Sequence, residues 1–323
     1  MNPKFDNFKI ESKKDTKEGL SKFTEKAMVL IEALPYIKAF AGKNIVVKTG
    51  GSFMEGNIIN KERVLTDVAF MQSVNMLPIL VHGGGPTLSK RLEEKAIKSE
   101  FINGHRVTNK EVLQEIHKTM NEEINPEYVK ILQKLGAQAK EVHGEDIITA
   151  VKKIEIDRGT GEEIDLGFVG VPLKVDTTYI QMMLDNKIIP VITPFGRGTD
   201  GQIYNINADL SAAAVAIALK SRKLVYLSDI PGVLRDSNDP NTLISELRVD
   251  EIENLKRDGV IKGGMLPKVE SAIETLSAGV KNVHFIDGRM EHALLLELFT
   301  DSGVGTIFSE KESGKKITKE DQS

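Results

Sequence analysis

The chain has 323 residues, a formal net charge of −4, 40% hydrophobic and 28% charged residues, and no cysteine. This size suits one large α/β domain or two lobes, and the absence of cysteine excludes disulfides, thiolate catalysis and cysteine-ligated metal sites. The acidic balance argues against nucleic acid as a partner. The sequence contains no apolar run of about 18 residues, so we predict no membrane span. We therefore expect a cytoplasmic protein.

The first predicted element is a helix ahead of the core, within an N-terminal arm at residues 1–41. Its apolar side chains recur at helical spacing: Phe23, Ala27, Leu30, Ile31 and Leu34. Pro35 is expected to kink or end this helix. An apolar stripe needs a partner, which can be the chain's own domain or another subunit, and both alternatives stay open.

Strands and helices then alternate along the core. The predicted strands are residues 44–48, 78–82, 188–193, 223–228 and 282–286, and the predicted helices include 63–76, 210–219, 249–256 and 268–277. Residues 151–156 and 163–169 flank a glycine turn and predict a hairpin. Thr108 and Glu111 predict a capping box, while Pro126 is expected to open a helix that Gly136 closes. The alternation predicts a mostly parallel sheet with helices on both faces.

Three glycine-containing elements fall at predicted strand or helix ends: Lys48–Gly51, Gly83–Gly85 and Gly263–Lys268. Glycine lets backbone N–H groups approach anions and lysine supplies charge, so together they indicate phosphate handling. The alternative is that the glycines serve tight turns and the lysines are solvated. Lys48 ends an apolar strand, and Lys268 starts a helix where a cation is disfavoured without an anion, which favours a functional role. The chain lacks the glycine patterns of P-loop NTPases and of ordinary Rossmann dehydrogenases.

Polar residues near other predicted element ends are further candidates. Asn207 or Asp209 can cap the helix that follows, while in a functional role Asn205 would form hydrogen bonds and Asp209 would position the lysines or a metal. Arg106 suits a substrate carboxylate, with a surface salt bridge as the alternative. The histidines lack the spacing of a zinc site, and His82 is expected to be packed and hydrogen-bonded rather than a general base.

Together these motifs resemble the amino acid kinase family over about residues 44–308. The matching stretches are Val47–Gly51, Val81–Pro86, Gly104–Thr108, Asp165–Gly170, Asn205–Asp209, Leu227–Leu234, Gly263–Lys268 and Asp287–Arg289. Each is short, but their joint order is specific. The resemblance implies an open αβα sandwich with an eight-stranded, mainly parallel central sheet, preceded by the N-terminal helix. It also implies an acyl-acceptor lobe at 42–219, a nucleotide-binding lobe at 220–309 and a flexible tail at 310–323.

The resemblance further implies a reaction. The arginine before Val-Thr and the Asn-Ile-Asn-Ala-Asp run favour members that phosphorylate the γ-carboxylate of N-acetyl-L-glutamate with ATP, in arginine biosynthesis. Mg²⁺ would arrive with ATP, with no metal ligand from protein side chains. The implied catalytic residues are Lys48, Lys268 and Asp209. The implied acceptor-binding residues are Gly84, Gly85, Arg106 and Asn205, and the nucleotide-binding residues are Gly50, Gly51, Asp229, Gly232, Leu234 and Lys268.

The arm and residues 291–306 resemble arginine-sensitive members of the family. This implies inhibition by arginine near His292, Gly303 and Gly305, and a homo-oligomer, a dimer or a hexamer of dimers, joined through the arm. Thr49, His105 and Asn121–Asn125 depart from the family pattern on the acceptor side. Two alternatives therefore stay open: a related kinase with another carboxylate acceptor, and a non-catalytic regulator that binds arginine or nucleotide.

Overall fold

The computed structural model describes residues 17–50, 54, 58–156, 160–263, 265–300 and 303–310, with side chains described from residue 24 onward. The prediction for Gly51 falls outside the described residues, and so does the predicted tail at 310–323 apart from its first residue. No helix in the described part of the chain is long and apolar enough to cross a membrane.

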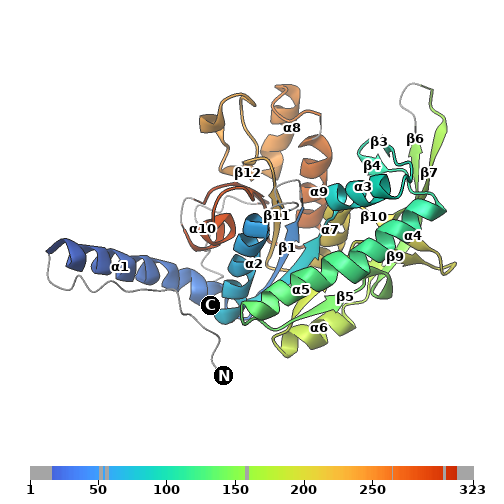
Figure 1. Cartoon of the computed structure of the whole chain (residues 1–323). Helices are drawn as coiled ribbons and strands as arrows, with labels where there is room; N and C mark the ends of the chain where they lie inside the picture. The colour runs from blue at the N-terminus through green and yellow to red at the C-terminus, as the bar shows by residue number, and fades with distance from the viewer. Residues whose placement is uncertain are drawn as a thin grey trace.

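An eight-stranded sheet forms the centre of the molecule (Figure 1). Its strands, in spatial order, are β12 (Glu246–Arg248), β14 (Thr306–Ser309), β13 (Asn282–Asp287), β11 (Lys223–Ser228), β1 (Asn44–Thr49), β2 (Leu77–His82), β8 (Ile189–Ile192) and β5 (Ala139–Val142). Strand β14 runs antiparallel to β13, and the other neighbouring pairs are parallel. The predicted mainly parallel sheet is confirmed.

Helices cover both faces of the sheet. One layer contains α2 (Ile58–Ser73), α5 (Asn125–Lys134) and α10 (Ala293–Phe299), and the other contains α6 (Thr178–Asp185), α7 (Ala208–Ala218), α8 (Val249–Arg257) and α9 (Met265–Ser277). Successive strand residues point to opposite faces. Thus Ile45 and Val47 join the core under α2, while Val46 joins the core under α7. The αβα sandwich is confirmed.

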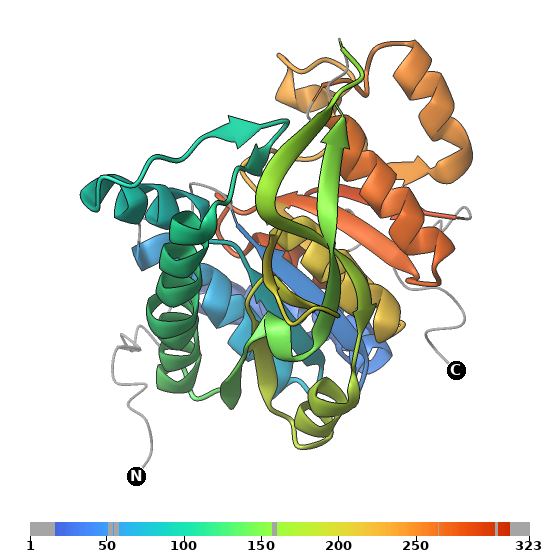
Figure 2. The same ribbon diagram turned by 90° about the vertical axis from the view of Figure 1, so that its right-hand side faces the viewer.

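A small four-stranded barrel lies beside the sheet. It consists of β6 (Ile148–Ile156), β7 (Glu163–Val175), β9 (Phe195–Gly198) and β10 (Ile203–Ile206). The pairing of β6 with β7 confirms the predicted hairpin, and its two strands run side by side beyond the edge of the central sheet (Figure 2). A further short pair, β3 (Phe101–Ile102) and β4 (His105–Arg106), lies near α3 (Gly85–Glu94).

The helix that follows Arg106 differs from its predicted boundaries. Helix α4 (Lys110–Thr119) continues through a π-helical segment (Met120–Ile124) into α5, so Pro126 lies inside a continuous helical run and does not open it. The cap of α4 is Asn109, whose side chain accepts a hydrogen bond from the Val112 N–H at 2.9 Å. Thr108 instead donates to the Arg106 carbonyl, so the predicted capping box is wrong. Gly136, at a φ of 86°, follows the helix end as expected.

Helix α1 (Lys17–Phe40) projects from the rest of the molecule (Figure 1). It runs through Pro35, so of the two predicted effects of this residue, a kink or an end, the end is wrong. Its last turns bury Tyr36, Ala39 and Phe40, but Leu30 is 69% exposed. Of the predicted apolar stripe, Ala27, Leu30, Ile31 and Leu34 are therefore exposed, while the neighbouring Ala33 packs against the core. Docking on another subunit stays a proposal.

Candidate functional site

The carboxyl ends of three neighbouring parallel strands lie at one edge of the sheet. In register, Lys48 of β1 is opposite Val81 of β2 and Tyr226 of β11. Beyond the strand ends, the Gly83 N–H donates to the Thr49 carbonyl at 2.9 Å. This edge is where ligands bind in open α/β sheets, and it carries the glycine and lysine elements of the sequence.

Lys48 forms an ion pair with Asp209 across this edge. The Nζ to Oδ1 distance is 2.7 Å, and the two side chains are 13% and 26% exposed. Asp209 lies in the first turn of α7, which is capped by Asn207 through a 2.7 Å hydrogen bond from the Asp209 N–H to the Asn207 side chain. Because Asn207 caps the helix, the carboxylate of Asp209 is available to the lysine.

The second lysine acts on the same carboxylate. Lys268 lies in the first turn of α9. Burial alone would raise the pKa of Asp209, but the charge and hydrogen bond of Lys48 and the charge of Lys268 together lower it below its usual value. Residues more than 200 positions apart in sequence therefore lie within electrostatic reach of one carboxylate.

The charge of this cluster favours an anion. Two ammonium groups and one carboxylate leave a net positive charge, and Asp209 and Lys268 both lie at helix N-termini, where the dipole adds to the attraction. Burial strengthens each of these interactions relative to water. A phosphate group suits the remaining charge.

The glycines next to the cluster have distinct roles. A Cβ added at Gly50 would lie 2.5 Å from the Nζ of Lys48, so a side chain there would displace the ammonium group. A Cβ at Gly84 would lie 2.6 Å from the Sδ of Met120, in the π-helical segment. At Gly85 nothing lies within 4 Å, so the helix N-terminus is open at this point.

Arg106 lies against the N-terminus of α3. Its guanidinium donates to the Gly85 carbonyl at 3.2 Å, to the Ser89 hydroxyl at 2.7 Å and to the Ser99 hydroxyl at 2.6 Å. It also lies over the ring of Phe101. These contacts bring two of the implied acceptor residues together. The two serines carry no sequence signal, since only the folded chain brings them near the arginine.

Asn205 reaches the same region from the barrel. Its side-chain amide donates to the Thr108 hydroxyl at 3.2 Å, and Thr108 in turn donates to the Arg106 carbonyl at 2.8 Å. Strand β10 thus connects Asn205 with Arg106 through one threonine. Sequence reasoning placed Thr108 in a helix cap and missed this contact.

The residues implied for nucleotide binding follow β11. Asp229 is exposed directly after the strand, and its charge acts on Arg289, which is paired with Asp287 at the end of β13. Gly232 has a φ of 138°, and a Cβ there would lie 2.5 Å from the Thr306 hydroxyl, so the turn requires glycine. Leu234 forms an isolated bridge to Leu243.

The residues implied for arginine binding surround α10. His292 precedes this helix and pairs with Asp67 of α2 at 2.6 Å. The Gly303 N–H donates to the Thr300 hydroxyl at 3.3 Å. The Gly305 N–H donates to the Glu297 carboxylate at 3.1 Å. These contacts join the three residues to α2, to α10 and to the loop after α10.

Glu297 belongs to a buried polar chain close to the end of α1. Its carboxylate lies 2.8 Å from Nδ1 of His284, whose Nε2 lies 3.0 Å from the Nζ of Lys223. That ammonium lies 4.9 Å from the centroid of the Phe40 ring. The chain therefore connects α10 to the last residue of the arm helix.

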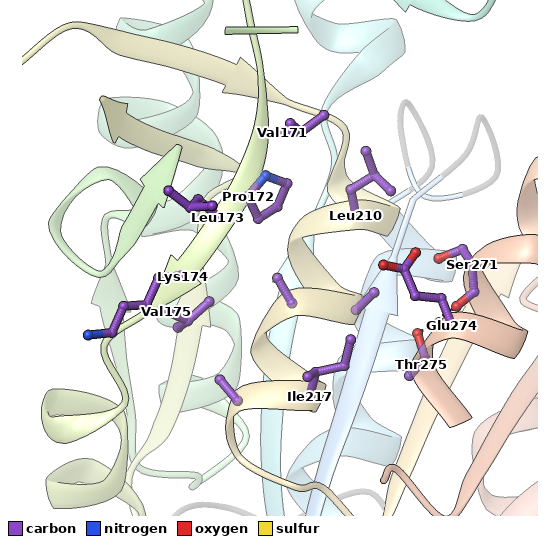
Figure 3. Close-up of a pocket in the computed structure, with 13 residues that line it drawn as sticks. Val171, Pro172, Leu173, Lys174, Val175, Leu210, Ile217, Ser271, Glu274 and Thr275 are labelled. Carbon is purple, nitrogen blue, oxygen red and sulfur yellow. Dashed lines mark hydrogen bonds between the residues drawn. The ribbon is translucent and has the colours of Figure 1, made fainter. Parts of the chain in front are cut away.

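A pocket of about 590 Å³ lies between β7, α7 and α9 (Figure 3). Leu210, next to Asp209, and Ser271, one turn after Lys268, line it. It contains none of the residues implied for catalysis, acceptor binding or nucleotide binding.

Within the described residues, no group of three or more His, Cys, Asp or Glu side chains could hold a metal ion.

A comparison against known families identifies the family of this chain. The model of the amino acid kinase family matches residues 43–287. The chain belongs to the amino acid kinase family. The resemblance inferred from the motifs is therefore confirmed, and with it the fold.

Curated relatives give a narrower comparison within this family. The acetylglutamate kinase of Carboxydothermus hydrogenoformans is 46% identical over 294 residues, which cover 90% of this chain and 100% of the relative. The acetylglutamate kinase of Archaeoglobus fulgidus is 41% identical over 287 residues, covering 88% of this chain and 99% of the relative. This chain thus matches these relatives over nearly their whole length.

Solved structures show the same fold. N-acetylglutamate synthase from Neisseria gonorrhoeae, complexed with coenzyme A and N-acetyl-glutamate, has a TM-score of 0.75 and 25% identity, covering 88% of this chain and 63% of that chain. Carbamate kinase from Giardia lamblia, bound to AMP-PNP, has a TM-score of 0.62 at 18% identity, covering 84% of this chain and 99% of that chain. The second likeness supports the fold alone.

Proposed function

We propose that this chain transfers the γ-phosphoryl group of ATP to the γ-carboxylate of N-acetyl-L-glutamate. The observation that carries the proposal is the joining of Lys48, Asp209 and Lys268 at the carboxyl edge of the sheet. Relatives named acetylglutamate kinase, 41–46% identical over nearly their whole length, support this acceptor.

The reaction suits these residue types. A carboxylate oxygen attacks the γ-phosphorus, the bond from that phosphorus to the β,γ-bridging oxygen breaks, and ADP leaves, so no general base is needed. Catalysis then depends on positioning and on neutralising negative charge. Lys48 and Lys268 supply two positive charges, and Asp209 holds them in place. A Mg²⁺ ion bound to the ATP phosphates would add to this neutralisation.

The acceptor residues complete the arrangement. Arg106 presents a planar fork suited to a carboxylate, and Asn205 presents an amide suited to the acetamido group. Gly84 and Gly85 begin α3, where backbone N–H groups favour anions. Residues 42–219 would form the acceptor lobe. Asp229, Gly232 and Leu234 would contact the nucleotide in the lobe at 220–309.

An acceptor panel tests the proposal. Purified protein with ATP and Mg²⁺ is given N-acetyl-L-glutamate, L-glutamate, L-aspartate or carbamate, and hydroxylamine traps any acyl phosphate as a hydroxamate. We expect a product with N-acetyl-L-glutamate, lost in Lys268→Ala and kept in Lys262→Ala, which removes an exposed lysine of the same segment. A product with another acceptor alone would favour the related-kinase alternative. Nucleotide or arginine binding without any product would favour the regulator.

The related-kinase alternative has one supporting observation. The departures from the family pattern lie close to the acceptor residues, because Gly84 packs against the π-helical segment that contains Asn121. Asn121 is buried and donates to the Glu145 carboxylate at 3.0 Å. A segment that departs from the family pattern next to Gly84 and Gly85 would change the shape of the acceptor site, and with it the preferred acceptor.

Inhibition by arginine is a further part of the proposal. A solved N-acetylglutamate synthase of 25% identity was crystallised with coenzyme A and L-arginine, and its TM-score is 0.72. The segment around His292, Gly303 and Gly305 meets the buried chain from Glu297 to the arm helix, so a ligand there would contact the arm and the core together. An unchanged rate at millimolar arginine would remove this part of the proposal.

A further inference from the structure

His82 is a buried group to which the proposed mechanism gives no role. It is the last residue of β2 and is 0% exposed. Its ring stacks on that of Tyr128 in α5, with centroids 4.8 Å apart and planes 25° apart. Packing therefore fixes both the position and the plane of the imidazole.

The hydrogen bond of the ring fixes its tautomer. Nδ1 of His82 lies 3.1 Å from the Gly83 carbonyl oxygen. A carbonyl can only accept, so Nδ1 carries the proton. Burial lowers the pKa of His82 to about 4, and the hydrogen bond to the Gly83 carbonyl opposes this without outweighing it. The ring is therefore neutral near pH 7.

The same carbonyl belongs to the first peptide of the glycine turn. The Gly83 N–H is held by the Thr49 carbonyl, and the Gly83 C=O is held by His82, so the residue is fixed on both sides. In a trans peptide the C=O and the next N–H point in opposite directions, so the N–H of Gly84 faces away from His82. Among the described residues this N–H has no hydrogen-bond partner.

The other side of the turn faces the lysine cluster. A Cβ added at Gly83 would lie 3.8 Å from the Cα of Gly50 and 3.9 Å from the Cβ of Ala208. Gly50 directly follows the strand that carries Lys48, and Ala208 is the first residue of the helix that carries Asp209. The turn therefore lies between the buried imidazole and the place where the phosphoryl group would transfer.

We propose that His82 is a positioning residue for phosphoryl transfer: its Nδ1–H holds the Gly83 carbonyl, which directs the Gly84 N–H at the transferring group. This inference rests on the proposed function. Without the imidazole donor, the Gly83–Gly84 peptide is free to rotate and the oriented N–H is lost. Because donors aimed at developing charge act mainly in the transition state, kcat depends on His82 more than KM does.

Two matched substitutions and one donor-free substitution at His82 test the donor. The side-chain nitrogen of asparagine occupies about the position of Nδ1, and that of glutamine about the position of Nε2. We expect His82→Asn to keep kcat within about three-fold, and His82→Gln and the donor-free His82→Phe to lower it by about ten-fold or more, with smaller changes in KM. Urea unfolding of all three separates loss of donor from loss of fold. Equal kcat values in Asn and Gln variants of equal stability would overturn the proposal.

A second measurement does not depend on activity. The six histidines are labelled with ¹⁵N, the ring of His82 is assigned by its loss in His82→Asn, and its tautomer is read from the nitrogen shifts between about pH 6 and 8. We expect a protonated Nδ1, and an unprotonated Nδ1 would overturn the inference in any case. A wild type that yields no hydroxamate would instead contradict the proposed function. If the wild type is inactive and Nδ1 is protonated, the hydrogen bond from His82 to the Gly83 carbonyl stands, but the proposed role of His82 in phosphoryl transfer is overturned.

Discussion

His82, at the end of β2, and Asp67, in α2, are buried titratable residues whose pKa values shift in opposite directions. Burial lowers the pKa of His82 from 6.5 to about 4, and burial raises the pKa of Asp67 from 3.8 to about 6 despite its bond with His292. Between pH 4 and 6.5 the unfolded chain binds a proton at His82 that the folded chain excludes, so acid lowers stability there. At Asp67 the folded chain holds the proton, so stability falls as pH rises from 3.8 to 6.

His82→Asn should remove the acid sensitivity that comes from the imidazole. We expect the unfolding free energy of wild type, relative to this variant, to fall by on the order of 3 kcal/mol between about pH 7.5 and pH 4. Urea unfolding at several pH values measures the difference, in which the Asp67 contribution cancels. Parallel stability curves for the two proteins would show that the buried ring does not titrate as described.

At this scale, part of the site could be predicted from sequence. Lys48 and Lys268 stood out because a lysine at a strand end or helix start needs an anion, and the ion pair of Lys48 with Asp209 agrees with their predicted grouping. Their catalytic roles stay predictions. Ser89 and Ser99 could not be found, because an ordinary serine becomes significant only when folding brings it to Arg106.

At the scale of elements, the π-helical segment and the glycine turn fit together. Gly84 lacks a side chain where Met120 and Ile124 approach most closely, while the following Gly85 faces open space. The φ of Gly84 is −162°, outside the left-handed region that favours glycine, so contact with neighbouring side chains accounts for the glycine there. The turn and the π-helical segment are therefore expected to shift together.

Gly84→Ala and Gly85→Ala form a matched pair. The added methyl at Gly84 must displace Met120 and Ile124, so we expect a loss of about 1–3 kcal/mol in unfolding free energy. At Gly85 the methyl meets nothing, and we expect a change within about 1 kcal/mol, toward higher stability. Urea midpoints of the two variants decide this. Equal destabilisation would mean that backbone conformation and not side-chain contact sets the requirement.

Prediction of elements from sequence depended on their length and burial. The five apolar strands predicted for the sheet were found because each is a continuous buried run flanked by turn residues. Strands β9, β10, β12 and β14 have three or four residues, too few for a periodic signal. The π-helical segment was not predicted, because one extra residue per turn barely disturbs the spacing of apolar residues. Pro126 was therefore interpreted as the first residue of a new helix.

At the scale of the whole molecule, the central sheet contains strands from both halves of the chain, and the arm helix α1 projects away from the rest of the molecule. Strand β11 from the second half pairs with β1 from the first, which places Lys48 near α9. The arm exposes Met28, Val29, Leu30 and Ile31 at 58% or more each. Contiguous exposed apolar surface of this kind indicates an interface. We propose that α1 joins copies of this chain, which is one of the two alternatives that the sequence left open.

Charges placed on the arm should therefore lower the assembly state. We expect the double variant Leu30→Glu, Ile31→Glu to show a smaller molar mass than wild type by light scattering, because burying two carboxylates opposes association. The double variant Glu25→Gln, Glu32→Gln, at exposed polar positions of the same helix, serves as a control. Equal masses for wild type and the charged variant would refute the arm interface.

The central claim is that Lys48 and Lys268, gathered by Asp209, move a phosphoryl group from ATP to N-acetyl-L-glutamate. The most direct test follows transfer of the labelled γ-phosphoryl group to this acceptor by wild type, Lys48→Ala and Lys268→Ala, with folding of each checked by urea unfolding. We predict labelled acyl phosphate from wild type and a loss of about 10²-fold or more in kcat for each variant. Turnover close to wild type in both folded variants would contradict the account.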